Sequence, residues 1–165
     1  MESRLKFLGH PVHPMLIVFP LGLLATAVIF DILYLITGNR DLATFSFWAM
    51  VAGIVGGLLA AVFGLLDWMA VPKDTRARRI GAIHGVGNVV VVGLFALSLL
   101  TRWNSPAYLP DILPFVFALL GAGLALFTAW LGGELVYRLR VAVDDDANLN
   151  ASNSISREGI AEVRT

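Results

Sequence analysis

The chain contains no cysteine and few charged residues, and each absence excludes classes of protein. Without cysteine there is no disulfide framework, no thiolate metal site and no iron–sulfur cluster held by this chain alone. Only 15% of the 165 residues are charged, against about 25% in soluble domains, and the formal net charge is zero. The neutral charge gives no reason to expect nucleic acid as a partner. The low charge excludes a soluble protein core and indicates a protein that lies in a lipid membrane.

Long apolar runs are abundant instead, since 58% of the residues are hydrophobic and the mean hydropathy is +0.79. About 20 apolar residues cross the hydrocarbon layer as a helix. The chain has four such runs, and they predict an all-α, integral membrane four-helix bundle of antiparallel up-down hairpins. The expected membrane domain covers residues 1–143. Residues 144–165 are acidic and rich in Asn and Ser, and we expect a disordered polar tail. The expected helices cover about residues 14–37, 42–67, 80–102 and 111–137.

Lysine and arginine are distributed unevenly between the two ends of the runs. Eight of those that flank the runs lie on the side of the termini, whereas Arg40 and Arg102 lie on the other side. The positive-inside rule therefore predicts a multi-pass membrane protein with both termini in the cytoplasm, which for a bacterial chain means the cytoplasmic (inner) membrane. The basic loop at residues 73–79 is typical of contact with anionic lipid in the bilayer.

The three histidines and two acids fall at the same predicted membrane face. Such groups at helix ends in a membrane protein are costly unless they pair, line water or hold a ligand. They are therefore the candidate site for chemistry. Asn88 follows His84 by one helical turn on the same face, and we expect it to share a cofactor site there. The candidate metal ligands are His10, His13, His84, Asp67 and Glu134.

Two ligand arrangements fit these residue types. One is a divalent metal held by two or three histidines and a carboxylate. The other is a b-type haem between the first and third spans, with His84 as one axial ligand and either His10 or His13 as the other. Spacing does not decide between His10 and His13, because the prolines beside them break the helical register. A structural alternative makes His84 a hydrogen-bonded contact between helices.

A faint internal repeat relates four of these groups. His13 opens the first span and Asp67 closes the second, and His84 and Glu134 repeat this order in the third and fourth. Two parallel hairpin repeats about an axis normal to the membrane would bring the four groups together.

Asp31 lies near the opposite membrane face, away from the histidines. Arg40 or Arg102 can reach it by snorkelling from the adjacent loops. We expect a paired acid at the interface and weigh it above a proton or ion step.

Four motifs resemble those of the bacterial four-helix integral membrane proteins of the DUF2231 family, a domain of unknown function. They are GHPVHP at 9–14, GLLDW at 64–68, TRARR at 75–79 followed by His84, and GGELVY at 132–137. The resemblance covers about residues 5–143. It implies a small membrane protein, some of whose relatives are joined to or found beside cytochrome-type and other redox modules. That association favours haem.

The leading hypothesis for function is a bundle that binds haem b, or otherwise a divalent metal, and serves in membrane electron transfer or as the anchor of a redox protein partner. The competing hypothesis is a structural or accessory protein without cofactor. Transport of ions, protons or a small solute ranks third, since four helices make a small transporter. The patterns leave open whether the protein is an enzyme and whether it forms a homo-oligomer.

Overall fold

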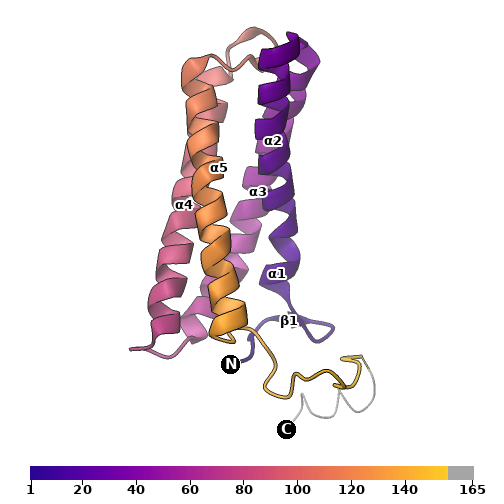
Figure 1. Cartoon of the computed structure of the whole chain (residues 1–165), viewed down its shortest axis with the longest axis vertical. Coiled ribbons are helices and arrows are strands. Elements are labelled where there is room, and N and C mark those ends of the chain that lie inside the picture. Colours follow the sequence, from indigo (N-terminus) through magenta and orange to yellow (C-terminus); the bar gives the residue numbers. More distant parts are fainter. Residues whose placement is uncertain (156–165) are drawn as a thin grey trace.

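Four long helical rods lie side by side in the computed structural model, which describes residues 1–155 (Figure 1). This arrangement confirms the all-α bundle of antiparallel hairpins expected from the apolar runs. Two strands of two residues each precede the first rod. The elements in chain order are β1 (Lys6–Phe7), β2 (His10–Pro11), α1 (Val12–Leu16), α2 (Val18–Thr37), α3 (Arg40–Ala70), α4 (Arg76–Arg102), the 3-10 turn η1 (Pro106–Tyr108), α5 (Ile112–Gly133) and the π-helical turn η2 (Glu134–Arg138).

Each rod is long and apolar enough to cross a membrane. The four candidate spans are Val12–Thr37, Arg40–Ala70, Arg76–Arg102 and Ile112–Arg138. Large apolar side chains are exposed along all four of them. A helix that is apolar on its outer face is stable only when that face meets lipid or protein. The protein is therefore a multi-pass membrane protein.

Three helix boundaries fall at polar or glycine positions outside the apolar runs. Gly38 ends α2 in the left-handed conformation, at φ 71°, and its N–H donates to the carbonyl of Tyr34. Asn39 then caps α3 by accepting from the N–H of Asp41, and Thr75 caps α4 by accepting from the N–H of Arg78. These caps explain why α3 and α4 begin earlier than the apolar runs predicted.

The first rod is interrupted at Ile17, where α1 meets α2. Pro20 lies one turn further along and has no N–H, so it cannot donate to the carbonyl of Leu16. The interruption separates the short α1, which carries His13, from the membrane-spanning length of α2. It places His13 close to α3.

The bundle consists of two hairpins, α2 with α3 and α4 with α5, within which the helix contacts are most extensive. Their inner faces meet in an apolar core formed by Leu24, Ala27, Val28, Met50, Val91, Phe95 and Ala118. Two glycines allow close approach: a Cβ on Gly53 would lie 2.7 Å from Leu24, and one on Gly121 would lie 2.9 Å from Phe95. Small residues at helix contacts replace the hydrophobic effect as the means of tight packing in lipid.

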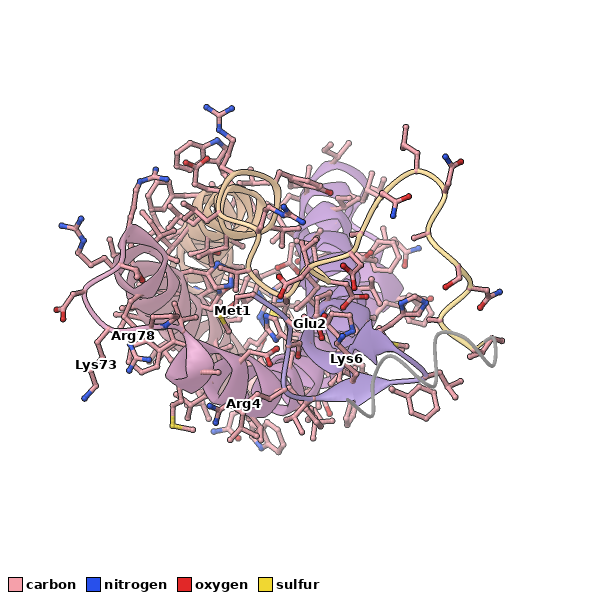
Figure 2. All side chains as sticks on the ribbon, turned by 90° about the horizontal axis from the view of Figure 1, so that it is seen from below. Met1, Glu2, Arg4, Lys6, Lys73 and Arg78 are labelled. Carbon is pink, nitrogen blue, oxygen red and sulfur yellow. The ribbon has the colours of Figure 1, made fainter. Side chains whose placement is uncertain are left out.

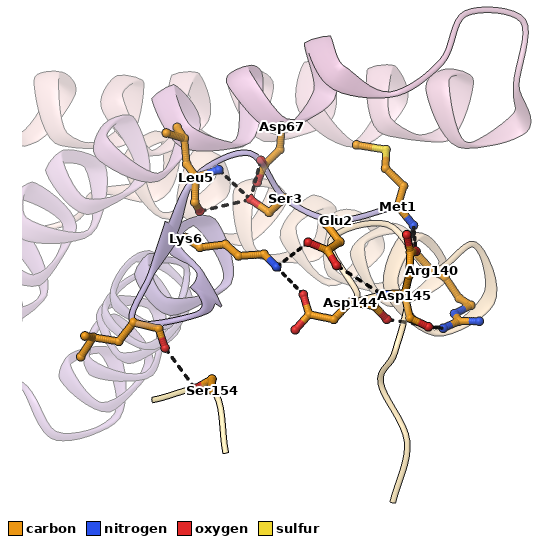
Figure 3. A network of polar contacts seen from close by, with 11 residues as sticks. Met1, Glu2, Ser3, Leu5, Lys6, Asp67, Arg140, Asp144, Asp145 and Ser154 are labelled. Carbon is orange, nitrogen blue, oxygen red and sulfur yellow. Dashed lines mark hydrogen bonds and ion pairs between the residues drawn. The ribbon is translucent and has the colours of Figure 1, made fainter. Parts of the chain in front are cut away.

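The segments that flank the bundle in sequence meet at one end, which we call the termini end (Figures 1 and 2). There Ser3 donates to the buried carboxylate of Asp67 at 2.6 Å. Lys6 forms ion pairs with Glu2 and Asp144 (Figure 3). Burial alone would lower the pKa of Lys6, but the hydrogen bonds to Asp144 and Glu2 outweigh it and raise the pKa. The ammonium therefore remains charged at neutral pH and ties Lys6 to Asp144, which is 138 positions away in the chain.

The segment after η2 has turns but neither helix nor strand as far as residue 155. It returns towards the start of the chain, where the hydroxyl of Ser154 donates to the carbonyl of Leu8 at 3.1 Å. Disorder of this tail was expected over 144–165. Residues 156–165 of that range lie outside the described residues.

Candidate functional site

Two of the three histidines come together inside the termini end of the bundle. His13 on α1 and His84 on α4 have ring centroids 6.5 Å apart, and their ring planes are perpendicular, at 88°. Both side chains are partly buried. One belongs to each hairpin, so the pair lies between the two halves of the molecule.

Each histidine donates to a backbone carbonyl of the neighbouring helix. Nδ1 of His13 lies 2.8 Å from the carbonyl oxygen of Ala60, and Nδ1 of His84 lies 2.9 Å from that of Thr128. A carbonyl oxygen can only accept, so each Nδ1 carries the proton. Each Nε2 of a neutral ring therefore keeps its lone pair, and this is how protein carbonyls orient metal-ligating histidines.

A glycine follows each of these carbonyls by four residues, directly under the imidazole ring. A Cβ on Gly64 would lie 2.8 Å from Cε1 of His13, and one on Gly132 would lie 3.3 Å from Cε1 of His84. The two hairpins thus contain the same unit: a histidine on one helix, and a carbonyl and a glycine one turn apart on the next. The histidine half of the expected repeat is present in the fold.

Asn88 lies beside His84, as expected from its place one turn along α4. Its amide nitrogen is 3.3 Å from Nε2 of His84 and 2.8 Å from the carbonyl oxygen of the same residue. The hydroxyl of Thr128 donates to Oδ1 of Asn88 at 3.1 Å. Thr128 therefore supports His84 twice, through its carbonyl and through Asn88, a role that the sequence analysis did not assign to it.

The two acids and the remaining histidine do not join this pair as ligands. Asp67 accepts from Ser3, and Glu134 forms an ion pair with Arg76 at 2.7 Å. His10 is exposed in β2. Within residues 1–155 no group of three or more His, Cys, Asp or Glu side chains is placed to hold a metal ion. The metal arrangement with a carboxylate is therefore not assembled in this part of the chain, because each acid has a nearer partner and the turn before α1 directs His10 outward.

A second polar cluster lies at the opposite end of the bundle. Both nitrogens of the Arg102 guanidinium fork bind the Asp31 carboxylate, at 2.9 and 2.8 Å. The sequence allowed either Arg40 or Arg102 as the partner, and the structure selects Arg102. Both side chains are fully buried rather than snorkelled to the surface.

Two buried serines extend this pair to all four rods. Arg102 donates to Ser98 at 2.9 Å and is 3.5 Å from Ser46, and Ser98 in turn donates to the carbonyl of Pro114 at 2.7 Å. The Nε of Arg102 is buried with no partner among the described residues. Sequence reasoning missed the serines. The spacing of Ser98 one turn before Arg102 on α4 was the available signal.

The apolar core separates the two polar clusters along every rod. On α4, for example, Val91 and Phe95 lie between His84 at one end and Arg102 at the other. The described residues therefore form no continuous polar path between the two ends, and this arrangement gives no support to transport through the bundle.

Comparison with models of protein families gives a match. The family model described as "Predicted membrane protein (DUF2231)" matches residues 9–145, which contain all four rods and both polar clusters. No curated protein and no solved structure matches the chain. Since the match covers most of the sequence, the chain belongs to the DUF2231 family of predicted membrane proteins.

Proposed function

We propose that His13 and His84 would hold the iron of a b-type haem, and that the protein serves in membrane electron transfer at its termini end. The observation that carries this proposal is the pairing of two imidazoles from different hairpins, each with its Nδ1 proton donated to a carbonyl. Imidazole nitrogens bind metals at about 2.0–2.1 Å, so a shared atom places two ring centroids roughly 6 Å apart. The separation of 6.5 Å agrees with this value.

The number of protein ligands favours haem over a bare ion. A bare divalent ion in a protein takes four or more ligands, usually with a carboxylate or a third histidine among them. The described residues provide two imidazoles and no third metal-binding side chain at that place. Haem brings four nitrogens of its own, so two histidines complete its coordination. The two glycines let each imidazole lie directly against the neighbouring helix, which fixes the position of both rings.

The chemistry that a bound haem would supply is one-electron transfer. The residues of the chain would hold and orient it. Ala60 and Thr128 fix the tautomers through their carbonyls, and Asn88 competes for Nε2 of His84. Because the pair lies at the termini end, electrons would be exchanged there, with a redox partner protein on that side of the membrane.

The cofactor-free alternative rests on one specific contact. Nε2 of His84 already accepts from Asn88, which satisfies the ring without any ligand. In this alternative the histidines hold the two hairpins together and the protein is a structural or accessory subunit.

An optical spectrum of the detergent-purified protein tests the proposal, in the oxidised and then the dithionite-reduced state, from cells supplied with iron and a haem precursor. We expect a Soret band that shifts on reduction, with sharp reduced-state bands. His10→Ala is the matched control and should keep the spectrum, since His10 is exposed. His13→Ala and His84→Ala should each lose it.

A featureless spectrum of a folded, haem-supplied protein would overturn the proposal and favour the accessory role. Metal analysis of the same sample addresses the bare-ion arrangement. Stoichiometric zinc, iron or copper without a haem spectrum, lost in both the His13 and His84 variants, would indicate a metal site and contradict haem.

A further inference from the structure

Residues 6–11 form a short hairpin that leaves the bundle at the termini end, just before α1. Its strands pair antiparallel, with Lys6 opposite Pro11 and Phe7 opposite His10. The two residues between the strands, Leu8 and Gly9, have φ values of 50° and 82°. Two positive φ values in a two-residue loop define the tight turn that joins such strands. The turn therefore fixes Phe7 and Leu8 at the tip.

The base of the hairpin is held to the bundle. The N–H of Val12 donates to the carbonyl of Leu5 at 3.0 Å, and the N–H of Leu5 donates to Ser3. Ser3 is itself bound to the buried Asp67 on α3, and Lys6 is held by two carboxylates (Figure 3). The hairpin is thus held in a fixed position relative to the bundle, because the polar groups at its base are hydrogen-bonded or ion-paired.

The side chains at the tip are apolar and exposed, whereas the backbone of Leu8 and Gly9 meets the tail at Ser154. The Phe7 side chain is 59% exposed and Leu8 is 63% exposed. Figure 1 shows the hairpin projecting sideways from the bundle, beyond the outline of α1 and α2. The first membrane span begins at Val12, one residue after β2, so the tip lies at the level where that span enters the bilayer.

We propose that Phe7 and Leu8 insert into the interfacial layer of the bilayer that the four rods cross, so that the hairpin is a lateral membrane anchor. Apolar side chains at this depth are stabilised by leaving water for the boundary of headgroups and acyl chains. A protein partner fits less well, because two side chains are far smaller than the roughly 800 Å² per partner of a stable interface. Lipid surrounds the rods at that level in any case.

Site-directed spin labelling tests the anchor, and the absence of native cysteine makes each label unique. Leu8→Cys and, separately, Phe7→Cys are labelled with a nitroxide in the full chain, which is reconstituted into phosphatidylcholine vesicles. Collision rates with oxygen, which concentrates in lipid, and with a water-soluble nickel complex are then compared. Val89→Cys on α4 is the lipid control, since Val89 is 69% exposed in the middle of a span, and Leu149→Cys in the tail is the water control.

The anchor predicts oxygen-to-nickel ratios at both tip positions that lie well above the Leu149 ratio and on the lipid side. Ratios equal to that of Leu149 would overturn it. Dipolar broadening between labels at Leu8 would also overturn it, since it would place the tip against a second copy of the chain. Cysteine meets the same backbone requirement as leucine at the positive φ, so the turn is preserved, and Phe7→Cys lies outside the turn.

Discussion

Arg102 and Asp31 show how a charged pair is accommodated deep in an apolar bundle. The carboxylate takes both nitrogens of the guanidinium fork, and two serines complete the remaining donors of those nitrogens. A bidentate pair of this kind is neutral as a unit, which lowers the cost of placing it out of water. Removing one partner leaves the other as an unpaired buried charge, so the full cost of burying that charge returns.

Asp31→Asn should therefore destabilise the bundle by about 3–5 kcal/mol, because it leaves the buried Arg102 charge without a counterion. Thermal unfolding in detergent, followed by size-exclusion of a fluorescent fusion, measures the loss. Asp111→Asn is the matched control at the same end and should leave the melting temperature unchanged, since Asp111 is exposed and forms no cap hydrogen bond.

The double variant Asp31→Leu with Arg102→Met removes both charges together. We expect it to regain much of the stability lost by Asp31→Asn, since no charge is left unpaired. If the double variant is less stable than the single one, the pair has a role beyond its own electrostatics.

Gly64 and Gly132 determine how closely each imidazole approaches the next helix. We expect Gly64→Ala to cost about 1–3 kcal/mol, as overpacking does, and to displace His13 from Ala60. Gly132→Ala should cost less, because its Cβ would meet His84 at 3.3 Å rather than 2.8 Å. Gly123→Ala has open space around it and is the control. Equal melting temperatures for Gly64→Ala and Gly123→Ala would contradict the packing described for His13.

At the scale of elements, one arginine connects the end of α3 to the start of α4. Arg78 donates to the carbonyls of Trp68 and Met69, in the last turn of α3, and to that of Val71, the residue that follows the helix. Its guanidinium also stacks on the Trp68 ring, 3.8 Å from the centroid. The junction between the two hairpins is therefore held by a side chain that the sequence presents as one member of a basic cluster.

Arg78→Ala should open this junction and expose Lys73 to proteolysis. Lys6 and Lys73 are the lysines of the chain, so an endoproteinase specific for lysine reports on the loop directly. We expect cleavage after Lys73 to be faster in Arg78→Ala than in the wild type. Arg79→Ala, which removes an exposed neighbour, is the control. Cleavage at the same rate in both variants would show that the arginine contacts do not hold the loop.

The whole molecule has a polar cluster at each end and an apolar core between them. Basic residues lie across the termini end, and Figure 2, which views the bundle from below, shows Lys73 and Arg78 at the left and Arg4 and Lys6 nearer the middle. The positive-inside rule predicts that this end, and with it the paired histidines, faces the cytoplasm.

Single cysteines test this orientation in intact bacterial cells. A membrane-impermeant maleimide should label Asn39→Cys, at the turn between α2 and α3, and should label Lys73→Cys only after the cells are permeabilised. The native chain, which has no cysteine, is the blank. The reverse labelling pattern would invert the proposed topology and place the histidine pair on the outer side.

The sequence alone determined the parts of this protein that depend on local composition. Four apolar runs specify four rods because the bilayer requires backbone hydrogen bonds to be satisfied within each segment. Histidines near helix ends indicated that these side chains gather at one end of the bundle, and His13 and His84 do lie together there. Which side chains meet was decided only by the tertiary structure. The prolines that flank His13 break the helical register, so the sequence does not predict where its side chain points. Asp67 and Glu134 have partners that are distant in sequence, Ser3 and Arg76. The burial of Arg102 likewise depends on four helices at once, which no single segment encodes.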